Sequence, residues 1–329
     1  MSASRLEDAR KQSTISNLQS PYARKVLSLL ICPRDKSPLV LRSDHLACDQ
    51  GHTIRIKNGI PDFIMGDENL SDEKLQQMAF HDDEEVNETF DEIVLRPFNY
   101  TKSYADSSLY HLRSFRKVLH AKLGIELQNT TILNCGCGGG MEAQFLAENG
   151  ALVAGFDISQ LRAEASATRF ALNGLDGLFY RGDSAHLPFP DNSFDLAFYH
   201  DSLHHVPIEE IPLAIRESVR VAKKGVVLLE AHDSPLRMLL EAFGLSSSIE
   251  ASGNYVFRFR KSLMEFFSSQ TSTELVNYSV TFMKHEHRPG FYARPLVGRL
   301  TFESIKLLGS LLRPFGNEAC IILKKASGV

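Results

Sequence analysis

The chain has 329 residues, of which 43% are hydrophobic and 23% carry a charge, and these values lie close to those of ordinary globular domains. They exclude a wholly disordered protein, and no apolar run approaches the ~18 residues that a membrane-spanning helix needs. A net charge of −4 disfavours nucleic acid as the main partner. The five cysteines are an odd number, which suits a reducing compartment, so we expect a cytoplasmic enzyme without a secretory signal.

The first hundred residues divide into three stretches. Residues 1–26 are polar and lack a sustained hydrophobic period, which predicts a flexible tail. Residues 27–66 contain short apolar runs separated by Pro, Asp and Gly, which predicts a small β-rich module. Between residues 67 and 92 there are eleven acidic residues and a single lysine, Lys74. We therefore expect residues 67–104 to form an acidic linker or solvated helices.

Residues 105–329 alternate between predicted strands and helices. Apolar positions at helical spacing occupy 104–123, and five strand-like runs follow: TTILNC, ALVAGFD, LFYRGD, FDLAFYHD and GVVLLEAHD. Strands that alternate with helices predict βαβ units and a mostly parallel sheet. Near the C-terminus, VNYSVTFMKHEH and NEACIILKK look like a further pair of strands. The predicted fold class is therefore α/β, with a small β-rich module in front.

A glycine-rich turn carries the strongest functional signal. In TILNCGCGGG, residues Gly136, Gly138 and Gly140 stand at G-x-G-x-G spacing between a predicted strand and a predicted helix. Such a turn brings backbone N–H groups against a ligand with no Cβ in the way. Asp157 ends the next strand, where a carboxylate can accept hydrogen bonds from a ribose diol. Asp183 ends the third strand, where we expect it to face an adenine ring.

These ordered motifs resemble the class I S-adenosylmethionine-dependent methyltransferases, above all the group that includes quinone-biosynthesis and small-molecule methyltransferases. The resemblance rests on ILNCGCGGG, GFDIS, GDSAHLPFPDNSFDLAFYHDSLHHV and AIRESVRVAKKGVVLLEAHDS, and it covers residues 105–235 most clearly. It implies a Rossmann-like sheet that ends in an antiparallel strand, S-adenosylmethionine as the cofactor, and a small-molecule acceptor methylated on O, N or C. The cofactor-binding residues that it implies are Asn134, Gly136, Cys137, Gly138, Gly140, Asp157, Ile158, Asp183, Ser184 and His200.

One residue departs from the family pattern. Asn134 stands where the family usually has Asp or Glu at the end of the first strand. An amide can still accept a hydrogen bond from the cofactor's ammonium, but a neutral hydrogen bond contributes only about 0.5–1.5 kcal/mol, against about 1.5–3 kcal/mol for a charged one. We therefore expect weaker cofactor binding, or a site that has lost its activity.

A general base is needed if the acceptor is a hydroxyl or a weakly acidic carbon. The candidates His200, His204 and His205 follow the fourth strand, with Asp201 beside them, and His232 follows the fifth. The carboxyl ends of parallel strands are where open α/β sheets bind ligands. An alternative is that His204 or His205 only caps the following helix.

The N-terminal module carries a second pattern. Cys32 and Asp35, then Cys48 and His52, have the spacing of ligand pairs on two turns that assemble a tetrahedral zinc site. The stretch resembles the zinc-ribbon-like module found before bacterial methyltransferases, and the metal site of the ribosomal RNA guanine-N1 methyltransferases, with Asp35 in place of one cysteine. The alternative is a metal-free module with an apolar core, built from Leu39, Leu41, Ile54, Ile56, Ile60 and Phe63.

The C-terminal region contains a basic amphipathic stretch at 288–315, which predicts a helical insertion. Such a helix either covers a site for an apolar acceptor or lies on a membrane surface. Tyr255 and Arg258 are candidates for the acceptor pocket by position alone. Two other functions remain open, namely a ribosomal or transfer RNA base methyltransferase and a catalytically silent activator subunit.

Overall fold

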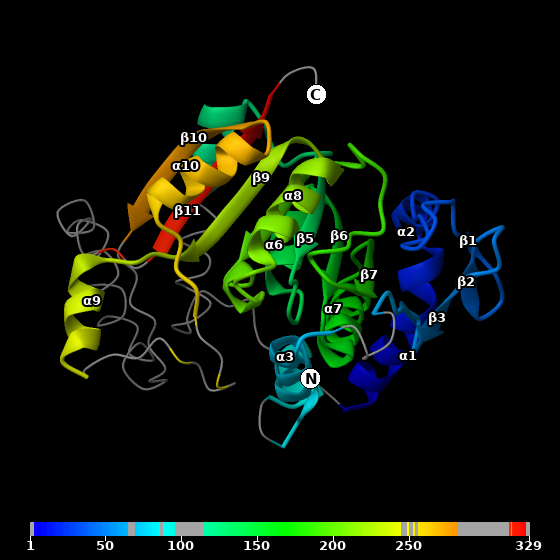
Figure 1. The fold of residues 1–329 in the computed structure, drawn as a ribbon. Helices are drawn as coiled ribbons and strands as arrows, with labels where there is room; N and C mark the ends of the chain where they lie inside the picture. The colour runs from blue at the N-terminus through cyan, green and yellow to red at the C-terminus, as the bar shows by residue number, and fades with distance from the viewer. Residues whose placement is uncertain are drawn as a thin grey trace.

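The computed structural model describes residues 3–64, 70–85, 88–95, 115–244, 249, 253, 256–281, 316 and 318–326. A seven-stranded sheet with the strand order β10-β11-β9-β8-β5-β6-β7 forms its centre (Figure 1). Strands β5 to β9 pair in parallel, and β11 pairs antiparallel with both β9 and β10. The strands are β5 Thr131–Cys135, β6 Leu152–Asp157, β7 Gly177–Arg181, β8 Phe194–His200, β9 Ala222–Ala231, β10 Thr273–Thr281 and β11 Glu318–Lys325. The predicted parallel sheet with antiparallel C-terminal strands is therefore confirmed.

The order of the strands marks where a ligand is expected. From β5 the chain passes outward through β6 to β7, and it then returns to the other side of β5 with β8 and β9. Open α/β sheets bind ligands outside the carboxyl ends of the strands at such a reversal. The central strands are buried on both faces, because neighbouring residues such as Ile132 and Leu133 belong to different hydrophobic cores.

Helices connect the strands and cover the sheet. They are α6 Met141–Glu148, α7 Gln160–Leu172, α8 Ile211–Val221, α9 Pro235–Ala242 and α10 Lys261–Gln270. Residues 115–123 are also helical and bury Phe115 and Leu119 in the core beneath the sheet. The alternating β and α elements thus follow the hydrophobic periods of the sequence.

The N-terminal residues form two helices, α1 Ala3–Gln19 and α2 Pro21–Leu27, and not the predicted flexible tail. Asn17 explains why this polar segment is ordered. Its side-chain amide donates to the carbonyl of Phe179 at 2.8 Å, and its Oδ1 accepts from the Phe179 N–H at 2.7 Å. One asparagine thereby satisfies both backbone groups of a residue in the edge strand β7, in the way that a neighbouring strand would. Figure 1 shows α1 and α2 beside β7.

The predicted β-rich module is present as a four-stranded antiparallel sheet. Its strands are β1 Val40–Leu41, β2 His45–Ala47, β3 Thr53–Lys57 and β4 Ile60–Pro61. Leu30, Leu46 and Ile54 are fully or almost fully buried within it. The module continues directly into the large sheet, because Asp62 forms a parallel bridge with Arg181 and the N–H of Phe63 donates to the carbonyl of Arg181 at 2.9 Å.

The acidic segment contains two helices, α3 Asp72–Asp82 and α4 Phe90–Leu95. The predicted helices are thus present, but they are docked on the protein instead of solvated. Lys74, Gln77 and Met78 are buried, at the i, i+3, i+4 spacing of one helix face. At its end, α3 contacts the start of α7, where Asp82 accepts from the Ser159 hydroxyl at 2.5 Å and from the Leu161 N–H at 3.1 Å.

Some expectations lie outside the described residues. They are the helical insertion at 288–315 and the acceptor-pocket candidate Tyr255. Within the described part of the chain, no helix combines the length and the apolar character needed to cross a membrane.

Candidate active site

A cavity of about 500 Å³ lies at the carboxyl ends of β5, β6 and β8. This size is typical of small-molecule sites. The strand ends and the loops after them provide one wall, which we call the sheet wall, and the acidic segment provides the other, which we call the helical wall. The sheet wall includes Gly136, Cys137, Gly138, Gly139, Asp157, Ile158, Gly182, Asp183, Ser184, His200, Asp201, Ser202 and His205, and the helical wall includes Lys74, Gln77, Phe80, His81, Glu88 and Ile93.

The glycine-rich turn has the geometry that its sequence predicts. Gly136, Gly138 and Gly140 all have positive φ, at 62°, 51° and 77°. A Cβ on Gly136 would lie 2.6 Å from the Cβ of Ser202, so the turn packs directly against the loop after β8. At Gly138 a Cβ would meet nothing within 4 Å. The backbone of the turn is therefore open on the side that faces the cavity.

Asp157 fixes this turn from the end of β6. One carboxylate oxygen accepts from the Gly138 N–H at 2.8 Å, and the other accepts from the Ser159 N–H at 3.0 Å. A carboxylate has about four acceptor positions, so these two bonds leave Asp157 able to accept from a ligand. The sequence places the carboxylate correctly, but its second role in holding the glycine turn is visible only in the structure.

Asp183 joins the two walls. Its Oδ1 accepts from the Ala185 N–H at 3.0 Å, while Oδ2 lies 2.6 Å from the ammonium of Lys74 on α3. The same ammonium contacts Glu210. Burial raises the pKa of Asp183, but the hydrogen bond to His186 and the charge of Lys74 outweigh it and lower the pKa to about 2. The expected partner of an adenine ring is therefore an ionised carboxylate already bound to a buried lysine.

His200 is the last residue of β8 and is almost completely buried. Its Nδ1 lies 3.1 Å from Glu142, and its Nε2 lies 3.7 Å from Asp201. Burial lowers the pKa of His200, but the charge of Asp201 and the hydrogen bond with Glu142 outweigh this effect and raise the pKa to about 9. This raised pKa favours the protonated form of His200 at neutral pH, which makes His200 a poor candidate for the general base.

His204 and His205 differ in their surroundings. His204 Nδ1 lies 2.7 Å from Glu230, which is fully buried and also accepts from the N–H groups of Ser202 and Leu203. This hydrogen bonding orients His204, which lies outside the residues that line the cavity. His205 does line it, and its ring contacts the ring of His81 on α3, with 5.9 Å between the ring centres. Of the three candidates, His205 and His200 reach the cavity.

Three other sequence candidates lie away from the cavity lining. Asn134 is buried in β5; its amide donates to the Phe198 carbonyl at 3.5 Å, and its Oδ1 has no hydrogen-bond partner among the described residues. Gly140 begins α6. His232 lies 2.7 Å from the hydroxyl of Tyr278 and 3.3 Å from the carbonyl of Phe259, and burial lowers its pKa. It therefore belongs to the packing of the chain after β9 against Phe259 and Tyr278.

The helical wall is the part of the site that sequence reasoning missed. Its residues come from the segment that we expected to be a linker or solvated helices. One signal was present, because Lys74 is the single lysine among eleven acidic residues and stands at i, i+3 spacing with Gln77. A buried lysine requires a carboxylate partner, but the sequence does not show that the partner is Asp183.

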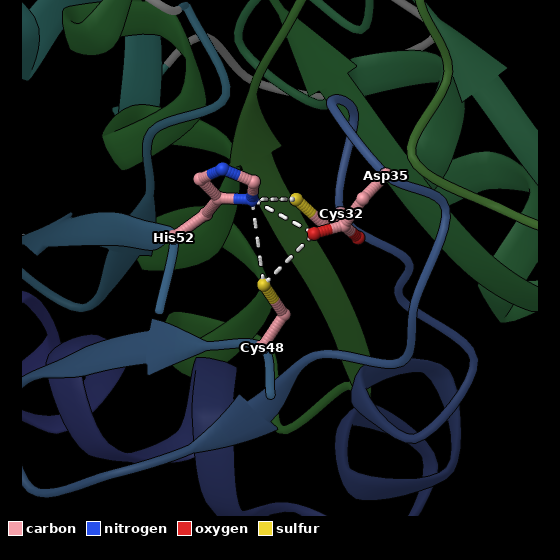
Figure 2. Close-up of side chains that lie close together, drawn as sticks. All are labelled: Cys32, Asp35, Cys48 and His52. Carbon is pink, nitrogen blue, oxygen red and sulfur yellow. Dashed lines mark hydrogen bonds and ion pairs between the residues drawn. The ribbon is translucent and has the colours of Figure 1, made fainter. Parts of the chain in front are cut away.

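The four residues of the predicted metal site also come together, and none of them lines the cavity. Cys32, Asp35, Cys48 and His52 place one sulfur, oxygen or nitrogen atom each within 4.8 Å of all the others (Figure 2).

Comparison with protein families gives one match, a methyltransferase domain, over residues 133–229. This span contains the glycine-rich turn, Asp157, Asp183 and the three histidines. Residues 133–229 therefore match a methyltransferase domain, in agreement with the sequence motifs.

Curated relatives match part of the chain. "Methyltransferase GfsG" of Streptomyces halstedii is 30% identical over 135 residues, which are 38% of this chain and 49% of that protein. "27-O-demethylrifamycin SV methyltransferase" of Amycolatopsis mediterranei is 35% identical over 97 residues, which are 29% of this chain and 35% of that protein. "2-phytyl-1,4-naphtoquinone methyltransferase" of Synechococcus elongatus is 32% identical over 145 residues, which are 42% of this chain and 61% of that protein. The chain thus spans about half the length of the curated relatives it matches.

A solved structure shares the fold. The magnesium protoporphyrin IX methyltransferase of Synechocystis PCC 6803, with bound SAH, superimposes with a TM-score of 0.52 and 16% sequence identity. The match covers 78% of this chain and 100% of that one. At this identity the match supports the Rossmann-like fold and does not extend to the substrate.

Proposed function

We propose that the protein transfers a methyl group from S-adenosylmethionine to an oxygen, nitrogen or carbon atom of a small-molecule acceptor. The observation that carries this proposal is that the glycine turn, Asp157, His205 and the α3 side chains line one and the same cavity. A cavity of about 500 Å³ that is closed on one side by a helix suits a small acceptor better than a base within folded RNA.

The residues of the sheet wall fit the cofactor. Asp157 would accept hydrogen bonds from the ribose hydroxyls, and Asp183 with the backbone of Ser184 would meet the adenine amino group. The backbone of Gly136 and Gly138, which both line the cavity, would lie beside the methionine part. The unpartnered Oδ1 of Asn134, just before this turn, is an acceptor that the described protein atoms leave unused. S-adenosylmethionine supplies an electrophilic methyl group on a sulfonium.

The protein's contribution to the chemistry is positioning and proton transfer. Holding the acceptor in line with the methyl group supplies much of the rate. His205 is the residue placed to take a proton from a hydroxyl or a weakly acidic carbon, because its ring lines the cavity beside His81. His200, as a buried cation next to the same cavity, would attract an acceptor that carries negative charge.

The names of the relatives support a small-molecule acceptor. Two of those relatives are named for a rifamycin and for a naphthoquinone. Both of these names denote small organic molecules and not nucleic acids.

The first test is a calorimetric titration of the full chain with S-adenosylmethionine and with S-adenosylhomocysteine. We expect micromolar binding of at least one. A folded protein that binds neither would contradict the cofactor assignment.

The second test follows a labelled methyl group from S-adenosylmethionine into separated fractions of a cell extract. We expect the label in the small-molecule fraction, with a reaction that lacks the protein as the negative control. Label in the RNA fraction would contradict a small-molecule acceptor and favour a base methyltransferase. Cofactor binding without transfer to any fraction would contradict catalysis and favour an activator subunit.

A further inference from the structure

The N-terminal module contains a cluster of side chains that the methyltransferase function does not use. It consists of Cys32, Asp35, Cys48 and His52, and Figure 2 shows their side chains pointing toward a common centre. Cys32 and Asp35 lie in the turn after α2, whereas Cys48 and His52 lie at the two ends of the turn between β2 and β3. Both turns must therefore be folded before the four side chains can meet.

The distances within the cluster are close to those of a tetrahedral metal site. With bonds of about 2.0–2.3 Å, two ligand atoms of such a site lie about 3.3–3.8 Å apart. The Cys32 sulfur lies 3.5 Å and the Cys48 sulfur lies 3.6 Å from His52 Nδ1, and the Cys48 sulfur lies 3.3 Å from Asp35 Oδ2. Asp35 Oδ2 and His52 Nδ1 are closer, at 2.8 Å, so this pair has to separate by about half an ångström.

The backbone around each ligand is fixed independently of a metal. In the first turn, the N–H of Cys32 donates to the Ser37 carbonyl at 2.8 Å, and its carbonyl accepts from the Lys36 N–H at 2.9 Å. In the second, the N–H of Cys48 donates to the His52 carbonyl at 3.1 Å. The cluster is therefore largely preorganised.

Asp35 is oriented as a ligand by its neighbour. Its Oδ1 accepts from the N–H of Ser37 at 2.8 Å and from the Ser37 hydroxyl. These two bonds leave Oδ2 directed at the sulfur and imidazole groups. Support of a ligating carboxylate by hydrogen bonds to its other oxygen is a regular feature of metal sites.

We propose that Cys32, Asp35, Cys48 and His52 bind one Zn²⁺ ion through two sulfurs, one carboxylate oxygen and Nδ1 of the imidazole. Four ligands leave no open coordination position, so the site is structural. Two thiolates and an imidazole favour zinc over Mg²⁺ or Ca²⁺, which prefer oxygen ligands. The ion would join the turn after α2 to the β2–β3 turn, in a module whose strands have only two to five residues and whose small core needs such a staple.

Metal analysis of the purified full chain is the primary test. We expect about one equivalent of zinc per chain, and replacement by Co²⁺ should give the visible bands of tetrahedral cobalt with a thiolate-to-metal band in the near ultraviolet. The other three cysteines, Cys135, Cys137 and Cys320, are buried elsewhere in the fold, so the thiolate band would report this cluster.

Four variants make the test specific. Cys48→Ser and Asp35→Ala should lose the metal. Their zinc affinity should fall by more than the roughly 10–100-fold that removal of an outer-shell partner causes, because each variant removes a ligand itself. Asp35→Cys completes a three-cysteine, one-histidine ligand set and should bind zinc more tightly than wild type. The matched control is His45→Ala, which removes another histidine of the same module that is paired with an aspartate, Asp44, at 2.8 Å. It should keep the full zinc content.

Two results would overturn the proposal. One is a folded chain, judged by circular dichroism, that contains no zinc and shows no cobalt bands after incubation with Co²⁺. The other is zinc that remains in both Cys48→Ser and Asp35→Ala, which would place the ion elsewhere. Because metal content and cobalt spectra do not depend on methyl transfer, failure here leaves the proposed function unaffected.

Discussion

The sheet wall and the helical wall of the cavity come from different parts of the chain. In the sheet wall, one continuous stretch, residues 133–229, supplies the glycine turn, the two aspartates and the histidines. In the helical wall, a segment that lies more than a hundred residues before Asp183 in the sequence docks through Lys74 and Asp82. The comparison teaches that a site can be recognisable from one wall alone while the other wall decides what fits into it.

The largest expected effect tests His205, where the two walls meet. His205→Asn should lower kcat by about 10²–10⁴-fold, because loss of a general base has that cost, while the cofactor dissociation constant stays unchanged. The assay is methyl transfer to a hydroxyl or carbon acceptor identified as above. His120→Asn, which changes an exposed histidine outside the cavity, is the control and should retain activity. A His205→Asn enzyme with full activity would remove His205 from the mechanism.

The second prediction concerns the ion pair of Lys74 with Asp183, which connects the two walls. Lys74→Met should lower the free energy of unfolding by about 3 kcal/mol, because it leaves the buried carboxylate of Asp183 without its ammonium partner. Urea unfolding measures the change. The control is Lys224→Met, since that half-exposed ammonium lies 3.8 Å from Asp195 and should contribute less than about 1 kcal/mol. Equal effects of the two variants would contradict the buried role of Lys74.

The same variant has a pH signature. The pKa of Asp183 is about 2 in the folded protein, below its ordinary value of 3.8, so its stabilising contribution is present above pH ~4 and is lost as the pH falls through 2. Removal of the Lys74 charge raises this pKa. The acid unfolding of Lys74→Met should therefore begin at a higher pH than that of wild type.

A third prediction concerns the sheet wall alone. The pKa of His200 is about 9 in the folded protein, against an ordinary value of 6.5. The stability that it contributes is therefore fully present below pH ~6.5 and is lost as the pH rises through 9, with a magnitude of about 3 kcal/mol. His200→Gln should flatten the unfolding free energy over this pH range. A variant with the wild-type pH profile would contradict the charged state of His200.

The smallest expected effect concerns cofactor affinity. Asp157→Ala should weaken S-adenosylmethionine binding by about 1–3 kcal/mol, because the ribose hydroxyls and the Gly138 N–H lose their acceptor. Calorimetry measures it. Asp176→Ala is the control, because Asp176 holds the N–H of Tyr22 at 2.9 Å and lies outside the residues that line the cavity. An unchanged dissociation constant in Asp157→Ala would rule out the assignment of Asp157.

The sequence by itself determined the parallel sheet, the position of the glycine turn, and the acids that end β6 and follow β7. These features depend on the hydrophobic period and on which residues stand at the ends of the strand-like runs. The sequence also brought Cys32, Asp35, Cys48 and His52 together as one predicted cluster, because the spacing of two short turns is local information.

Only the tertiary structure decided which polar residues are buried and paired. The composition of residues 1–26 and 67–92 predicts solvent exposure, yet Asn17 completes the edge strand and Lys74 bridges Asp183 and Glu210. The tertiary structure also distinguishes the histidines, because His204 hydrogen-bonds to Glu230 whereas His205 lines the cavity. The physical reason is that burial of a polar group is permitted wherever a partner meets it, and the partner is supplied by a distant part of the chain.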